Sequence, residues 1–184
     1  MSKELVPLKI HFLSASNDYK SLPLPKCTIK FDDVVLAEDI GIHSTVKEYQ
    51  ISIDDDIENE HKLEIFYNTK NNDIFDILPE DPNNRNGKIE YGVFINNIEL
   101  NEILLDTNSV LLGNISAIIC EKSEYDTHGF IHYLKENNSA DQIRIEDNKC
   151  IWETSSNYLN LDNSKYTFTF RTPMYLWLLE SLLQ

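Results

Sequence analysis

Short runs along the chain alternate apolar and polar residues. A period of two is typical of strands that bury one face, because successive side chains point to opposite sides. In the run 47–53, for example, Tyr49, Ile51 and Ile53 share one face. The runs that predict strands are 8–13, 27–31, 47–53, 61–67, 89–95, 115–120, 130–134, 141–146 and 150–153.

Aspartate and asparagine residues separate these runs and predict turns at Asp32–Asp33, Asp54–Asp56, Asn96–Asn97 and 146–148. The segment Glu102–Leu105 is too short for its period to distinguish a helix from a strand, so both remain open.

The pattern changes near the C-terminus. Phe168 and Phe170 alternate with threonines, and an apolar pattern at helical spacing then covers 173–183. Thr172 suits the N-cap of this helix and Pro173 its first position. One stripe of the helix contains Met174, Trp177, Leu178 and Leu182, and a second contains Tyr175, Leu179 and Leu183.

A helix this short cannot cross a bilayer, so we expect it to dock on its own sheet or on another subunit. The predicted packing and interface residues are Met174, Tyr175, Trp177, Leu178, Leu179 and Leu182.

Many short strands followed by one helix predict a mainly β protein: a β-sandwich or jelly-roll-like fold with a short C-terminal α-helix. A chain of 184 residues most economically forms a single domain, here 1–184. The segment 68–88 is rich in Asn, Asp and Pro and predicts a long loop. Loops of this length are usually functional or ordered by a partner.

The composition limits the classes of partner. The net charge is −15, from 31 acidic and 16 basic residues, and such a field repels nucleic acid. We therefore expect no direct nucleic-acid binding, and the N-terminal segment does not resemble a signal peptide. Cys27, Cys120 and Cys150 are few and widely spaced, which predicts buried, reduced side chains in a protein made in the cytoplasm.

An acidic cluster contains Asp54, Asp55, Asp56 and Glu58. Calcium requires several oxygen ligands that converge from one loop, so this cluster is a candidate calcium site. It lacks EF-hand spacing, and a solvated turn is the favoured interpretation. No other cofactor is predicted. His128 and His132 would lie ~13 Å apart on a strand, which is too far for one zinc ion.

Trp152 and Tyr158 are candidates for stacking on a sugar, although filling the core is the more common role of aromatic residues in strands. The chain has no GxSxG motif and no glycine-rich phosphate loop, so we predict that it is not an enzyme. A polysaccharide hydrolase remains an alternative, because its two carboxylates must be close in space and not in sequence.

Three ordered segments resemble one protein family. They are 31–33 with 51–65, then 92–103, and finally 165–182, which carries the most specific pattern, Phe-x-Phe-x-Thr-Pro-x-Tyr-x-Trp-Leu-Leu-Glu. The family comprises β-sandwich structural proteins of contractile-tailed marine phages, including cyanophages and pelagiphages. Some members resemble calcium-dependent xylan-binding modules. Departures from the family pattern are Tyr166 in place of a tryptophan, Asn and Asp in place of turn glycines, and an apparent insertion over 119–148.

This resemblance implies a virion structural protein that is made in the host cytoplasm. It would belong to the tail, baseplate, neck or capsid surface and would contact other virion proteins. It would also be a homo-oligomer or a multi-copy component of a symmetric particle, with no membrane association. The alternative is a carbohydrate-binding module that recognises a host surface glycan, with or without calcium.

Overall fold

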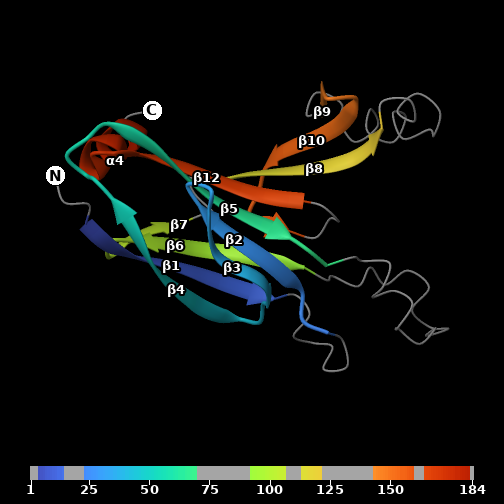
Figure 1. Ribbon diagram of the computed structural model, residues 1–184, viewed down its shortest axis with the longest axis horizontal. Coiled ribbons are helices and arrows are strands. Elements are labelled where there is room, and N and C mark those ends of the chain that lie inside the picture. Colours follow the sequence, from blue (N-terminus) through green and yellow to red (C-terminus); the bar gives the residue numbers. More distant parts are fainter. Residues whose placement is uncertain are drawn as a thin grey trace.

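The computed structural model describes residues 4–14, 23–69, 92–106, 113–121, 143–159 and 164–182. They form two antiparallel sheets and a short C-terminal helix, as Figure 1 shows. The predicted fold class, mainly β with a sandwich architecture and a short C-terminal α-helix, is confirmed. Within the described ranges, no helix is long and apolar enough to cross a membrane.

The first sheet has the strand order β11-β6-β1-β4, and β7 also pairs with β6. Its strands are β1 (Glu4–Ser14), β4 (Thr45–Ile53), β6 (Val93–Leu100), β7 (Ile103–Asp106) and β11 (Tyr158–Leu159).

The second sheet has the order β3-β2-β5-β12-β8-β10-β9. Its strands are β2 (Lys26–Phe31), β3 (Val34–Gly41), β5 (Asn59–Tyr67), β8 (Asn114–Glu121), β9 (Ile143–Glu146), β10 (Lys149–Ser155) and β12 (Ser164–Thr172). The chain crosses between the sheets from β4 to β5, and β12 enters the second sheet between β5 and β8.

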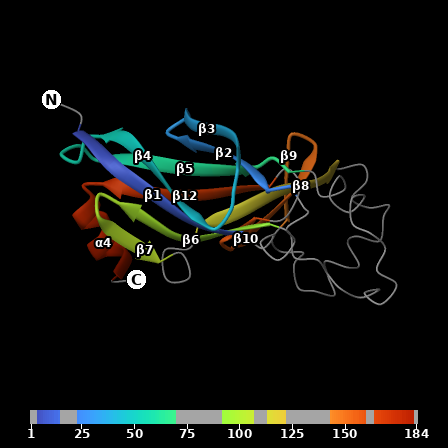
Figure 2. The ribbon, with the colours of Figure 1, turned by 90° about the horizontal axis from the view of Figure 1, so that it is seen from below.

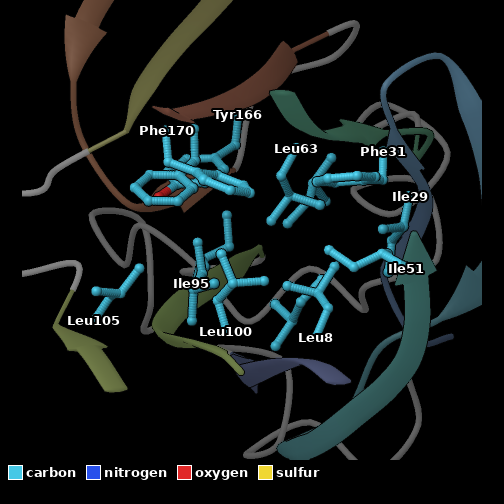
Figure 3. Packing of buried hydrophobic residues seen from close by; sticks show 14 of the residues in the cluster. Leu8, Ile29, Phe31, Ile51, Leu63, Ile95, Leu100, Leu105, Tyr166 and Phe170 are labelled. Carbon is cyan, nitrogen blue, oxygen red and sulfur yellow. The ribbon is translucent and has the colours of Figure 1, made fainter. Parts of the chain in front are cut away.

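The core lies between the two sheets. In Figure 3, Leu8, Ile95 and Leu100 of the first sheet face Leu63 and Tyr166 of the second, and all five are at most 2% exposed. In β1, β5 and β12 the core side chains occupy alternate positions, as the period-two pattern predicted, whereas in β6 the alternation changes phase between Ile95 and Ile98.

Three of the four predicted turns are confirmed, Asp54–Asp56 among them, and one is wrong. Asp32–Asp33 and Asp147–Asn148 have positive φ angles, which these two residue types tolerate, and they close tight hairpins. Asn96–Asn97, predicted as a turn, lies inside β6. Its pairing with β1 shifts register there, so the extra residue forms a bulge.

The chain turns back five residues after Asn96, at Asn101 and Glu102, whose φ angles are 48° and 68°. The hairpin leads into β7, which pairs with β6. The sequence did not distinguish a helix from a strand at Glu102–Leu105. In the structure, Glu102 belongs to a turn and the other three residues to a strand.

Several predictions fall on residues outside the described ranges: the strand at 130–134, His128, His132 and most of the loop 68–88. The ends of the apparent insertion 119–148 belong to β8 and β9, and its middle part also lies outside those ranges. Cys27 and Cys150 are buried free thiols, as predicted.

Candidate assembly site

Helix α4 (Met174–Leu182) lies at one end of the sandwich, close to the turn between β4 and β5 (Figures 1 and 2). It begins at Met174, one residue later than predicted. The Met174 N–H donates a hydrogen bond to Asp55 Oδ1 at 2.7 Å, across 119 residues of sequence. A carboxylate at a helix N-terminus satisfies a free N–H group and interacts favourably with the helix dipole, so Asp55 caps α4.

Thr172, the predicted cap, has a different role. Its hydroxyl donates to the Ile57 carbonyl oxygen at 2.6 Å, and its side chain is buried. The hydrogen bonds of Thr172 and Asp55 together attach the start of α4 to the β4–β5 turn.

The first predicted stripe of α4 packs against its own chain. Met174 and Trp177 are 4% and 9% exposed, and Leu178 packs against the core from its edge. The Trp177 ring lies 6.0 Å from the ring of Phe168, edge to face, and 6.0 Å from that of Phe170. These aromatic contacts hold α4 on β12.

The opposite side of α4 is apolar and exposed. Tyr175, Leu176 and Leu179 are 61%, 44% and 56% exposed, and we call these three residues the outer α4 face. A helix that packs with one face on a protein normally carries polar residues on the other. Leu182 ends the helix, and its side chain is not among those described.

A cleft of about 190 Å³ adjoins the outer α4 face. Its lining combines apolar Leu176 and Trp177 with charged Glu58, Arg171 and Glu180. Arg171 donates to Glu180 at 2.6 Å, so two of these charges compensate each other. The cleft has room for an apolar side chain of another protein, with polar groups around it.

The acidic cluster forms the turn that supports α4. Asp54 Oδ1 accepts a hydrogen bond from the Asp56 N–H at 3.2 Å, which shapes the turn, while Asp55 caps the helix. No group of three His, Cys, Asp or Glu side chains within the described ranges is arranged to hold a metal ion. The contacts of Asp54 and Asp55 thus give them a structural role in this turn.

The two candidate sugar-stacking residues are not brought together. Trp152 belongs to β10 of the second sheet and is partly buried against the core. Tyr158 belongs to β11 of the first sheet and stacks on Phe94, with 4.0 Å between the ring centroids. They therefore belong to different sheets and pack against different neighbours.

Sequence reasoning missed a cavity of about 620 Å³ at the start of β12, between β5 and β8. We call it the β12 cavity. Its lining combines the partly exposed Phe66 and Lys165 with the buried Ser164, the first residue of β12. Its lining includes Phe66, Asn68, Ser116, Arg144, Ser164 and Lys165.

The charges at the β12 cavity are paired. Lys165 and Lys62 each contact Glu64 at 2.8 Å. Burial acts to raise the pKa of Glu64, but these two ammonium groups outweigh it and hold the pKa below its usual value. Arg144 pairs with Glu146 and with Glu153. Ser164 is 1% exposed, and its hydroxyl has no hydrogen-bond partner among the described residues.

The chain matches no protein-family model, no curated protein and no solved structure.

Proposed function

We propose that this chain is a structural protein of a phage virion that assembles through the outer α4 face. The observation that carries the proposal is the exposure of Tyr175, Leu176 and Leu179 on a helix whose other side is firmly packed. Contiguous exposed apolar side chains are typical of protein interfaces. The virion context comes from the family resemblance, which is most specific over 165–182, the segment that contains α4.

The energetics favour such a contact. Burying one large apolar side chain contributes roughly 1.5–3 kcal/mol. The Asp55 cap and the Trp177 contacts already hold α4 in place, so binding need not order the helix. The outer α4 face is therefore a preorganised surface for another virion protein, and the proposal assigns no catalytic step to the chain.

The test is incorporation into particles. We expect mass spectrometry to find the chain in purified virions of the phage that encodes it. The double variant Tyr175→Ser, Leu179→Ser should fold normally but be depleted from particles at least tenfold. Val34→Ser, which changes a side chain 62% exposed on β3, is the matched control and should be incorporated normally.

Two results would contradict the proposal. One is a wild-type chain that is abundant in the lysate and missing from the particles. The other is a double variant that enters particles as efficiently as the control.

The β12 cavity favours a second candidate function, binding of a host surface glycan. Its charged side chains are paired with one another, and the Asn68 amide already donates to the Thr28 hydroxyl, which leaves the Ser116 and Ser164 hydroxyls beside apolar Phe66. A neutral ligand rich in hydroxyl groups suits such a lining, because it brings no uncompensated charge into the site.

A glycan array with and without EDTA tests this second candidate. We expect a sugar signal that Ser116→Phe, which fills the cavity, abolishes, while Ser155→Phe on the exposed part of β10 retains it. Loss of signal with EDTA would add calcium to the site. Silence on all glycans, or a signal unaffected by Ser116→Phe, would exclude the β12 cavity as a sugar site.

A further inference from the structure

Among the described strands, none pairs with the outer edge of β4 in the first sheet. β4 pairs with β1 over nine consecutive positions without a register shift. No hydrogen bond joins its backbone to any other described strand. The other sheet edges are different: β3 has two register shifts against β2, and β7, β9 and β11 have four, four and two residues.

A long regular edge is unusual in a folded protein. It exposes a row of N–H and C=O groups that can pair with another chain, and natural edges are commonly interrupted by bulges, prolines or very short strands. β4 contains no proline, no glycine and no bulge. It therefore retains the geometry that a further antiparallel strand requires.

We propose that β4 pairs with β4 of a second copy of this chain, antiparallel and across a two-fold axis, with Tyr49 at the centre. This contact is separate from the outer α4 face and does not depend on the proposed function. In a nine-residue strand, Tyr49 is the position at which all nine residues of each copy find a partner. The two first sheets then form one continuous sheet with an isologous interface.

Charge favours a second copy at this edge. The chain carries a net charge of −15, so most contacts between two copies would place acidic groups together. β4 instead carries one positive and one negative residue, Lys47 and Glu48. With Tyr49 at the centre, Glu48 lies opposite Gln50 and Lys47 opposite Ile51 of the other copy, so no like charges oppose each other.

Other registers fit less well. Centring the pair on Glu48 or on Lys47 would place that charge directly opposite itself, which is unfavourable. Centring it on Gln50 would leave Thr45 and Val46 of each copy unpaired. The full-length register also places the two Tyr49 side chains together, and each of these already packs partly against its own core.

A charge substitution at Gln50 tests the contact and its register. Gln50 is exposed, and it would face Glu48 twice in each dimer. Gln50→Glu creates two pairs of like charges, and Gln50→Lys creates two pairs of opposite charges. By sedimentation equilibrium at physiological salt, we expect the dimer dissociation constant to rise roughly tenfold for Gln50→Glu and to fall by a similar factor for Gln50→Lys.

Cross-linking gives a second, independent measurement. A mixture of Glu48→Cys and Gln50→Cys chains should form a disulfide-linked heterodimer on mild oxidation, because these positions are directly opposed. Each variant alone should cross-link much more slowly, since its two thiols would be diagonal neighbours about 7–8 Å apart.

The outcomes are distinct. A wild-type chain that stays monomeric up to millimolar concentration overturns the proposal and leaves the edge for a strand of another protein. A dimer that responds to neither Gln50 substitution also overturns it, because the contact must then lie elsewhere. The variant Tyr175→Ser, Leu179→Ser should dimerise normally, so failure of the β4 contact and failure of the α4 contact can be told apart.

Discussion

The side chain of Trp177 connects α4 to the sandwich. Its indole packs against Phe168 and Phe170 of β12 and is 9% exposed, although the helix around it is largely open to solvent. Together with the Asp55 cap, this side chain therefore keeps the outer α4 face in a fixed position.

We expect Trp177→Ala to lower the free energy of unfolding by about 3–5 kcal/mol, because it removes a large buried aromatic side chain and leaves a cavity. Leu179→Ala changes an exposed residue of the same helix and should cost less than about 0.5 kcal/mol. Urea denaturation followed by circular dichroism measures both. Equal stability of the two variants would show that α4 is not held by its inner stripe.

At the scale of elements, the periodic strands were predictable because their signal is local. Each of β2, β4 and β5 keeps one apolar face over consecutive alternate positions. Features that depend on a partner strand were not predictable. Asn96–Asn97 has the composition of a turn, but pairing with β1 keeps it in β6 as a bulge. The cap of α4 was predicted wrongly at Thr172 for the same reason, since the observed cap, Asp55, acts across 119 residues of sequence.

The close approach of β8 and β12 gives a prediction at this scale. A Cβ atom at Gly113 would lie 2.3 Å from the Tyr166 ring, so the backbone before β8 must move to accept any larger residue. We expect Gly113→Ala to cost about 1–3 kcal/mol of unfolding free energy. Gly41→Ala is the control, because its nearest contact is 3.3 Å from a Leu24 side-chain atom that can shift. Equal melting temperatures for the two variants would contradict this prediction.

At the scale of the whole molecule, the fold class followed from the sequence, but the functional surfaces followed only in part. The two stripes of α4 were visible in its spacing, yet which one is buried depends on how β12 and the β4–β5 turn meet. The β12 cavity had no sequence signal, because it arises where β5, β8, β9, β10 and β12 come together from distant parts of the sequence. The free β4 edge likewise depends on sheet order.

The buried Cys27 thiol and Tyr166 phenol should make the stability of the whole fold decrease at alkaline pH. Burial raises the pKa of Cys27 from 9.0 to about 12, and burial also raises that of Tyr166. In the unfolded chain both groups ionise at lower pH, so the unfolded state loses protons first. Stability is therefore complete below pH 9 and falls as the pH rises toward 12, by about 1.4 kcal/mol per pH unit for one such group.

Urea titrations at pH 8, 9, 10 and 11 measure this dependence. Cys27→Ala should reduce the slope of unfolding free energy against pH above pH 9. Cys150→Ala also removes a buried free thiol, so its slope is compared with that of Cys27→Ala. A wild-type protein equally stable at pH 8 and pH 11 would show that these groups ionise as easily in the folded state as in the unfolded state.

The central place of β12 in the second sheet has a consequence for biosynthesis. β5 and β8 both pair with β12, and β12 is translated after every other strand. On the ribosome, β2, β3 and β5 on one side therefore stay separate from β8, β10 and β9 on the other until β12 emerges. We expect folding to finish only after translation of β12, so that nascent chains present the outer α4 face only once the body that supports it is complete.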